Sequence, residues 1–290
     1  MLFLRLLAKL PFPVLYFISD TLFIVIFYMA SYRRKVVFEN LSRAFPDRTP
    51  QQIKQLSRKF YRNLTDIIVE TLKLLSITPE ELRRRVAIKN LAVLNHFLSR
   101  EQTVVVMTSH QCNWEWILVR CALDMTAIAD GIYKPLTNPF FEKIMRSIRT
   151  RFNTHLVPAQ QLPRSLVSRK NIPRAIALVA DQIAAPESAY WTDFLNQDTA
   201  FFAGGAKIAV SQQLPIVFVE MKRISRGFYE INLSLLAEPP YQASKMTGLI
   251  EKYVRTAEKS ILQNPADWLW SHRRWKHSRK TTLVTDVTQS

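Results

Sequence analysis

The sequence is poor in glycine and cysteine, and each shortage excludes a class of function. Only five glycines occur, at positions 131, 204, 205, 227 and 248. They cannot be assembled into a Walker A loop or a G-x-G-x-x-G fingerprint, so P-loop and dinucleotide chemistry is not expected. The two cysteines, Cys112 and Cys121, cannot make a disulfide framework or, by themselves, a four-ligand zinc site. We therefore expect no metal site and no resident cofactor.

Acidic residues are also scarce relative to basic ones. Lys and Arg total 40 against 23 Asp and Glu, which gives a net charge of +17. A charge this high indicates an anionic partner, which could be nucleic acid, anionic lipid or an acidic protein. Hydrophobic residues make up 48% of the chain, so a full core is possible and global disorder is excluded.

One long apolar run lies near the N-terminus, at residues 12–30, and its single charge is Asp20. As a helix it would reach roughly 28 Å, just enough to cross a bilayer core. Asp20 would cost about 2.5–3.5 kcal/mol near the centre. Arg33, Arg34 and Lys35 follow at once, which places the bulk of the chain in the cytoplasm. We expect a single membrane span, with an interfacial helix as the alternative. The residues before Ala30 fit the cleavage site of a signal peptide poorly.

The pattern beyond the apolar run divides the chain into further regions. Residues 50–76 show helical spacing with Pro50 in the first turn, and residues 78–81 begin a short helix with a capping box. Beyond residue 86, apolar strand-like runs at 103–108, 126–133, 175–180, 214–221 and 228–236 alternate with helical stretches at 112–124, 138–150, 160–169 and 204–213. This alternation predicts an α/β fold with a mixed, mostly parallel sheet covered by helices. We expect an anchor at 1–32, a helical region at 33–85, an α/β domain at 86–280 and a tail at 281–290.

A candidate catalytic pair follows the first of these strands. His110 closes the 103–108 run, and Glu115 stands about one turn into the next helix. A histidine at the carboxyl end of a strand can act as a general base, and a carboxylate can hold its other ring N–H. Spacing alone is weak evidence, because His96 and Glu101 have the same separation, although His96 lies inside a helical pattern and Glu101 precedes a strand. By itself His110 could equally be a satisfied histidine at a strand end.

The sequence around His110 and Glu115 is more informative than their spacing. SHQCNWEW at 109–116 resembles the H-x4-D/E motif of the lipid A late acyltransferases, within the lysophospholipid acyltransferase superfamily. The resemblance covers roughly residues 1–280 and is closest to a Bacteroidetes-like branch. It continues through VVFENLSRAFPD at 36–47, FYRNLTDIIVETLKL at 60–74, GIYKP at 131–135, RTRF at 149–152, ADQ at 180–182, FFAG at 201–204 and WLWSHRRWK at 268–276. The chain departs from that branch at Ala206, where relatives commonly carry a glutamate, so no acceptor role can be assigned there.

The resemblance implies transfer of a fatty acyl chain from acyl carrier protein to a hydroxyl of a lipid A precursor, at the cytoplasmic side of a bacterial inner membrane. In the reaction that the resemblance implies, His110 takes the proton of the acceptor hydroxyl and Glu115 holds the imidazole. The acyl-carrier-protein thioester is the donor substrate, and no cofactor is required. Residues that we expect to bind substrate are Asn113, Lys134, Arg149, Arg151, Asp181 and Gln182. The arginines suit phosphate recognition, although they could be ordinary solvated residues.

Several alternatives stay open from the sequence. The same pair would serve another lipid acceptor, such as a lysophospholipid, an ornithine lipid or a glycolipid. A non-catalytic membrane scaffold is the alternative from another class. Cys112, next to the pair, could form an acyl-cysteine, although the family chemistry is direct transfer. The indoles and cations at 268–276 suit a membrane interface or the core. Nucleic acid is not expected, because a groove for single strands would leave the apolar N-terminus unexplained.

Overall fold

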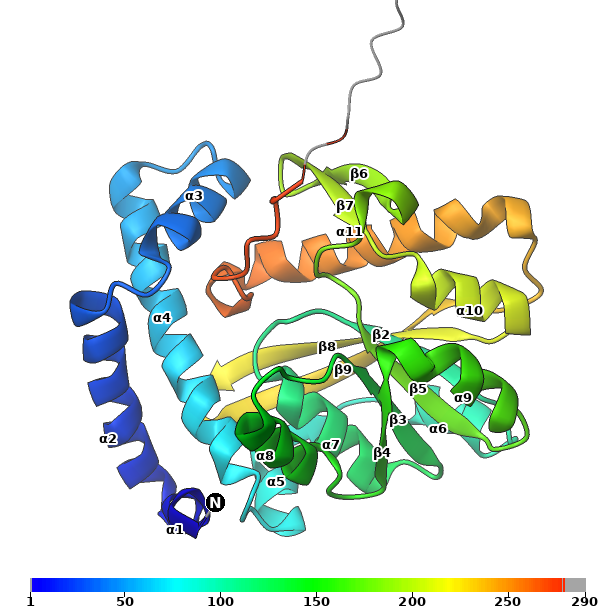
Figure 1. Cartoon of the computed structure of the whole chain (residues 1–290), viewed down its shortest axis with the longest axis horizontal. Helices are drawn as coiled ribbons and strands as arrows, with labels where there is room; N and C mark the ends of the chain where they lie inside the picture. Colours follow the sequence, from blue (N-terminus) through cyan, green and yellow to red (C-terminus); the bar gives the residue numbers. More distant parts are fainter. Residues whose placement is uncertain (1, 278, 280–290) are drawn as a thin grey trace, which may run out of the picture.

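A seven-stranded sheet forms the centre of the computed structural model, which describes residues 2–277 and 279 (Figure 1). The strand order is β1-β9-β8-β2-β5-β3-β4, and every neighbouring pair is parallel except β8 and β9. A separate antiparallel pair, β6–β7, lies outside this sheet. The strands are β1 (Val86–Ile88), β2 (Val104–Thr108), β3 (Ile128–Tyr133), β4 (Thr154–Pro158), β5 (Arg174–Val179), β6 (Tyr190–Phe194), β7 (Gln197–Phe201), β8 (Ile216–Ser225) and β9 (Phe228–Ala237).

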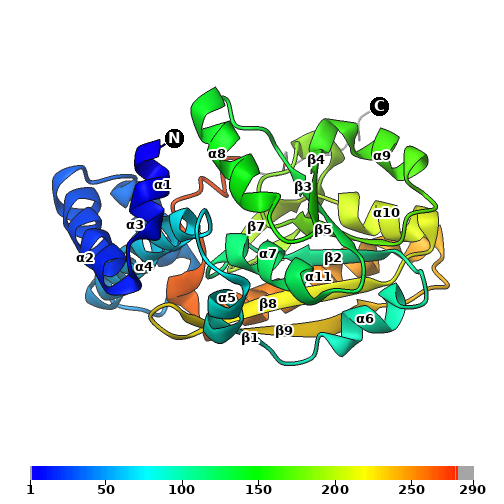
Figure 2. The same ribbon diagram turned by 90° about the horizontal axis from the view of Figure 1, so that it is seen from below.

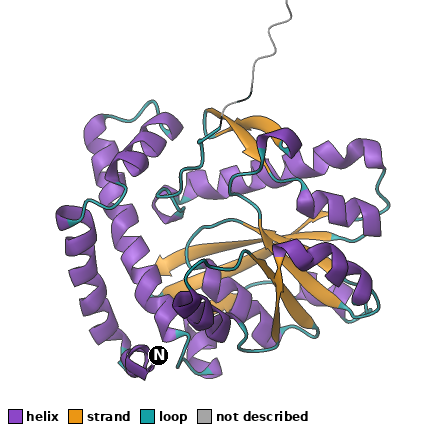
Figure 3. Ribbon diagram, viewed as in Figure 1, coloured by secondary structure: helices purple, strands orange, loops and turns teal. Residues whose placement is uncertain are grey.

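Helices cover both faces of the sheet, as Figures 2 and 3 show. The α-helices that follow residue 78 are α5 (Pro79–Arg85), α6 (Ala92–Leu98), α7 (Trp114–Asp124), α8 (Pro139–Arg149), α9 (Leu162–Ser168), α10 (Gly204–Gln212) and α11 (Met246–Gln263). Val104 and Val106 of β2 pack into the core under α5, α6, α7 and α8, whereas Val105 and Met107 pack into the core under α10 and α11. Because alternate residues of a strand point to opposite faces, both sets can be apolar only when both faces are covered. The expected fold class is thus confirmed.

The N-terminal part is helical and packs beside the sheet. It contains α1 (Leu2–Lys9), α2 (Phe12–Phe23), a π-helical continuation at Ile24–Met29, α3 (Arg34–Ala44) and α4 (Pro50–Lys73). Thr49 caps α4 through a capping box with Gln52, and Thr78 caps α5 by accepting from the backbone N–H of Glu81. Phe12–Met29 is long and apolar enough to cross a membrane, with a mean hydropathy of 1.9. In both ribbon views α2 lies alongside α4.

The five expected strands and four expected helices of the α/β part are present within a few residues. The sequence analysis missed β1, β4, the β6–β7 pair and α11, whereas α3 falls within the expected helical region at 33–85. β1 has three residues and β4 ends in a proline at the sheet edge, so neither has the long apolar run that marks a central strand. The division at 32, 85 and 280 stays a prediction, and the tail at 281–290 lies outside the described residues.

Candidate active site

His110 is held at the carboxyl end of the sheet by a carboxylate from the neighbouring strand. β2 and β5 run parallel with Thr108 opposite Val179, so the residues that follow them meet. The imidazole Nδ1 of His110 lies 2.6 Å from Oδ1 of Asp181. The backbone N–H of His110 donates to the other carboxylate oxygen, Oδ2, at 2.8 Å. Two bonds from one carboxylate therefore fix both the backbone and the ring of His110.

The Asp181 carboxylate is buried, and a third donor completes its shell. The indole N–H of Trp268 donates to Oδ2 at 2.7 Å. Burial by itself would raise the pKa of Asp181, but the charge and N–H groups of His110, together with the Trp268 indole, hold that pKa below its ordinary value. Asp181 therefore stays ionised, as a group that stabilises an imidazolium must. Because an ionised carboxylate only accepts hydrogen bonds, we assign the imidazole proton to Nδ1.

The other ring nitrogen of His110 faces the open side of the site. Its only side-chain partner among the described residues is Gln182, whose amide nitrogen Nε2 lies 3.1 Å from Nε2 of the imidazole. With the proton on Nδ1, this nitrogen has a free lone pair and can accept the Gln182 amide or the proton of a hydroxyl. The ring of Trp114 stands edge-on to the imidazole, with 5.2 Å between ring centroids. Nε2 of His110 can therefore accept a proton from a group that enters the cavity on this side.

Glu115 does not hold the imidazole, contrary to the sequence-based expectation. Within the described residues no hydrogen bond or ion pair joins Glu115 to His110, because Asp181 occupies the Nδ1 side. Glu115 instead accepts two bonds from Arg149, at 2.7 Å from Nε and 2.5 Å from Nη2. The indole N–H of Trp114 adds a third bond at 3.1 Å. Burial alone would lower the pKa of Arg149, but the paired carboxylate raises it above its ordinary value.

A mainly apolar cavity of about 650 Å³ opens beside His110 and the Glu115–Arg149 ion pair. Both His110 and Glu115 line it, together with Arg149, Lys134 and Gln182. Its apolar wall comes from the sheet and the helices around it: Val106, Ile117, Leu118, Ile132, Leu156, Ala177, Leu178, Val179, Ile183 and Phe202. At Gly131 an added Cβ would lie 3.0 Å from Leu118 and 3.2 Å from Leu156, so the absence of a side chain keeps this wall open. The volume lies within the roughly 300–1,000 Å³ that ligand pockets occupy.

The remaining predicted binding residues divide into rim and scaffold. Lys134 is exposed at the cavity, and none of the described residues holds its ammonium in a hydrogen bond or ion pair. Arg151 does not line the cavity; its guanidinium donates to the backbone carbonyls of Leu74 and Ile77, which end the α4 region. Asn113 is fully buried, caps α7 and donates to Glu70 at 2.9 Å. Arg151 and Asn113 are therefore committed to the fold.

Cys112 is unsuited to carry an acyl group. It is fully buried, and its Sγ donates to the carbonyl of Met221. Burial raises the pKa of this thiol well above its ordinary value. The thiolate needed for nucleophilic attack is therefore suppressed.

The C-terminal segment packs into the core rather than against a membrane. Trp268 and Trp270 are 2% and 0% exposed, and Arg274 donates to the buried carbonyl of Ala200. The backbone of this segment pairs with the histidine loop, since Leu269 N–H donates to the His110 carbonyl and Cys112 N–H to that of Asp267. Of the two placements left open for these indoles, the structure shows the core. What the sequence did not indicate is that the indole of Trp268 would donate to the carboxylate of Asp181.

A histidine held by a buried carboxylate beside an apolar cavity has the geometry that general-base chemistry on a hydrophobic substrate requires. The bacterial lipid A biosynthesis acyltransferase family matches residues 1–277. The chain therefore belongs to that family, and it is an acyltransferase.

Relatives of this chain that align over nearly its whole length are also acyltransferases of lipid A biosynthesis. The chain is 21% identical over 277 residues to a lipid A biosynthesis lauroyltransferase of Escherichia coli strain K12, covering 94% of this chain and 89% of the relative. It is 20% identical over 272 residues to a palmitoleoyltransferase of lipid A biosynthesis from the same strain, covering 93% and 87%. Among solved structures, the 1-acyl-sn-glycerophosphate acyltransferase PlsC of Thermotoga maritima aligns over 89% of this chain and 97% of its own, at 13% identity and a TM-score of 0.38.

Proposed function

We propose that this acyltransferase moves a fatty acyl chain from an acyl-carrier-protein thioester to a hydroxyl of a lipid A precursor, at the cytoplasmic face of a bacterial inner membrane. The observation that carries the proposal is the His110–Asp181 pair at the edge of an apolar cavity, in a chain that belongs to the lipid A acyltransferase family. The reaction needs no resident metal or cofactor, because the thioester is already activated.

The chemistry follows from the orientation of the imidazole. The acceptor hydroxyl takes the place of the Gln182 amide and donates to Nε2 of His110. As that nitrogen takes the proton, the hydroxyl oxygen attacks the thioester carbonyl carbon. Asp181 stabilises the imidazolium through Nδ1–H without being protonated. When the tetrahedral intermediate collapses, the carbon–sulfur bond breaks and His110 returns its proton to the thiolate, which leaves the carrier with a free thiol.

The charged rim suits an anionic acceptor. Lys134 is exposed at the cavity, and Arg149 carries its guanidinium to the same opening while paired with Glu115. An arginine can present bidentate donors to a phosphate, and a lysine offers a mobile positive charge. We propose that both bind the phosphorylated headgroup. Glu115 then serves this site by holding Arg149, and not by orienting His110.

The donor side of the proposal depends on charge. The net charge of +17 favours encounter with an acidic carrier protein, and such long-range attraction is screened over about 8 Å at physiological salt. Loss of steering should lower kcat/KM for the carrier more than kcat.

The experiment is acyl transfer by the purified chain in detergent, with an acyl-carrier-protein donor. Acceptor arms are a lipid A precursor carrying 3-hydroxyacyl chains, a lysophospholipid and an ornithine lipid, each analysed by mass spectrometry. Acylation of the lipid A precursor that is lost in His110→Ala supports the proposal. Transfer confined to another acceptor would overturn the acceptor assignment, and a fully active His110→Ala variant would overturn the mechanism. If kcat/KM for the carrier does not fall as the salt concentration is raised, the proposal that charge steers the carrier to the enzyme is contradicted.

A matched pair of variants tests the rim. Lys134→Ala should raise KM for the lipid A precursor and leave the KM for the carrier nearly unchanged. Lys170→Ala, an exposed lysine that does not line the cavity, is the control.

A further inference from the structure

The outward face of the N-terminal helices is apolar, although the inward face is docked on the enzyme. Along α2 and its continuation, Phe12, Leu15, Ser19, Phe23 and Phe27 are buried at three- or four-residue spacing. On the opposite side the large apolar side chains are exposed, including Phe17 at 73% and Met29 at 75%. The same holds for α1, where Leu2, Phe3 and Leu6 are exposed. An exposed apolar strip of this length indicates a surface that meets lipid.

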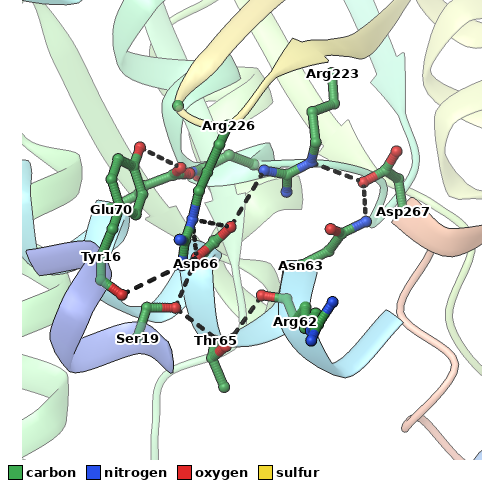
Figure 4. A network of polar contacts seen from close by, with 12 residues as sticks. Tyr16, Ser19, Arg62, Asn63, Thr65, Asp66, Glu70, Arg223, Arg226 and Asp267 are labelled. Carbon is green, nitrogen blue, oxygen red and sulfur yellow. Dashed lines mark hydrogen bonds and ion pairs between the residues drawn. The ribbon is translucent and has the colours of Figure 1, made fainter. Parts of the chain in front are cut away.

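Polar side chains fix α2 to the body of the protein, as Figure 4 shows. The Ser19 hydroxyl donates to Asp66 at 2.6 Å, and the Tyr16 hydroxyl donates to Glu70 at 3.0 Å, so two residues of α2 bind two of α4. Arg226, in the turn between β8 and β9, then bridges Asp20 and Asp66, with both Nη2–Oδ1 distances at 2.7 Å. Asp20, the one charge in the apolar run, thus forms an ion pair with Arg226 of the α/β part of the chain.

This docking is incompatible with a span by the same helix. In a span, α2 would carry α4 with it into the hydrocarbon, since the two lie alongside each other. The exposed side of α4 carries Lys54, Arg58, Lys59 and Arg62, and several cations at that depth would be strongly unfavourable. A span would otherwise require α2 to leave α4, which would break the Ser19 bond to Asp66 and the Tyr16 bond to Glu70 and separate Asp20 from Arg226.

The cations are placed instead for lipid headgroups. The Arg62 guanidinium lies 5.1 Å from the Phe23 ring centroid and that of Arg58 lies 5.9 Å from Tyr28, so both flank the apolar strip. A groove of about 470 Å³ at the end of the strip is lined by Phe27, Phe38, Arg34, Lys35 and Lys54, with Lys35 also 3.9 Å from Glu39. Apolar side chains bordered by lysine and arginine match the boundary between acyl chains and anionic headgroups.

The active-site side of the molecule agrees with this placement. Leu136, Phe140 and Phe141, at and just before the start of α8, are exposed large apolar residues, and Leu136 lines the cavity. Figure 2 shows α1 and α8 projecting on the same side of the protein. We propose that α1 and α2 do not cross the membrane but lie in one leaflet of an anionic phospholipid bilayer, with α2 still docked on α4. The cavity rim is then brought to the lipid surface.

Topology can be read from single cysteines, since Cys112 and Cys121 are buried. Arg5→Cys on α1 is labelled with a membrane-impermeant maleimide in right-side-out and inside-out inner-membrane vesicles, with Lys59→Cys on α4 as the control. We expect both cysteines to be labelled only in inside-out vesicles. Labelling of position 5 from the outer side, or its failure to label from the inner side, would overturn the proposal.

Depth and docking give two measurements independent of acyl transfer. A fluorophore on Thr21→Cys, near the middle of the apolar run, in vesicles of phosphatidylethanolamine and phosphatidylglycerol should be quenched by spin labels near the headgroup; strongest quenching at the bilayer centre would indicate a span. In the same vesicles, Ser19→Cys with Thr65→Cys should cross-link, because the two hydroxyls lie 3.1 Å apart. Val14→Cys with Thr65→Cys is the outward-facing control. Absence of the first cross-link would show that α2 leaves α4 in the bilayer.

Discussion

Nδ1 of His110 and Oδ1 of Asp181 lie 2.6 Å apart, although 71 residues separate them in the chain. The same carboxylate binds the His110 backbone N–H and the Trp268 indole, so it connects the loop between β2 and α7, the loop after β5 and the C-terminal segment. This relationship gives the aspartate a role as the positioning group for the proposed base. It also separates that role from Glu115, which is committed to Arg149.

Asp181→Asn should lower kcat by roughly 10²-fold or more with a smaller change in KM, because the amide cannot stabilise an imidazolium and can select the wrong tautomer. Steady-state acyl transfer at saturating acceptor measures it. Trp268→Phe, which removes one donor to Asp181 and keeps an aromatic ring, should lower kcat less. A wild-type kcat in folded Asp181→Asn would refute this role.

Stability should depend on pH through the same carboxylate. The folded-state pKa of Asp181 is depressed, so its contribution is fully present above the unfolded value of about 3.9 and is lost as pH falls through the lower folded value. The gap in free energy of unfolding between wild type and Asp181→Asn should therefore be constant near pH 6–7 and shrink below about pH 4. Urea unfolding followed by tryptophan fluorescence measures it, and a gap that widens in acid would contradict the assignment.

Arg151→Ala should destabilise the fold by about 1–3 kcal/mol, because its guanidinium satisfies the carbonyls of Leu74 and Ile77 at the end of the α4 region. The KM for the lipid acceptor should change little in the folded fraction. Arg149→Ala is the comparison, and there the acceptor KM should rise. A large KM effect of Arg151→Ala without loss of stability would restore its original assignment to phosphate binding.

Gly131→Met should shorten the acyl chain that the enzyme prefers. A side chain at this position projects between Leu118 and Leu156 into the apolar wall of the cavity. Competition between acyl carrier proteins loaded with chains of different length measures the preference. Gly248→Met provides the control, because an added Cβ there meets nothing within 4 Å. An unchanged preference would mean that the acyl chain lies elsewhere.

Cys112→Ser should keep most of the activity, since the thiol is buried and protonated and the proposed transfer is direct. The hydroxyl can still donate to the Met221 carbonyl that now accepts from Sγ. Mass spectrometry of the intact enzyme, quenched during turnover without acceptor, should find no acyl adduct at this position. Accumulation of such an adduct would favour an acyl-cysteine route.

The sequence by itself determined the fold class, the family resemblance and the place of His110 at a strand end. Those follow from local information: apolar runs, caps and a motif contained within a few residues. It also placed Asp181 at the carboxyl end of another strand. It could not pair the two, because the partner of a histidine depends on which strands become neighbours, and β2 and β5 are adjacent although β3 and β4 lie between them in the chain.

Tertiary structure decided the remaining roles for the same reason. The five-residue spacing of His110 and Glu115 allows contact, but the Glu115 carboxylate instead binds Arg149, the last residue of α8. Trp268 and Trp270 have the composition of an interfacial segment, yet the backbone pairing of Gln111 with Trp268 draws them into the core. The apolar run at 12–30 has the length of a span, but the ion pair of its one charge, Asp20, with Arg226, more than two hundred residues away, depends on the tertiary fold.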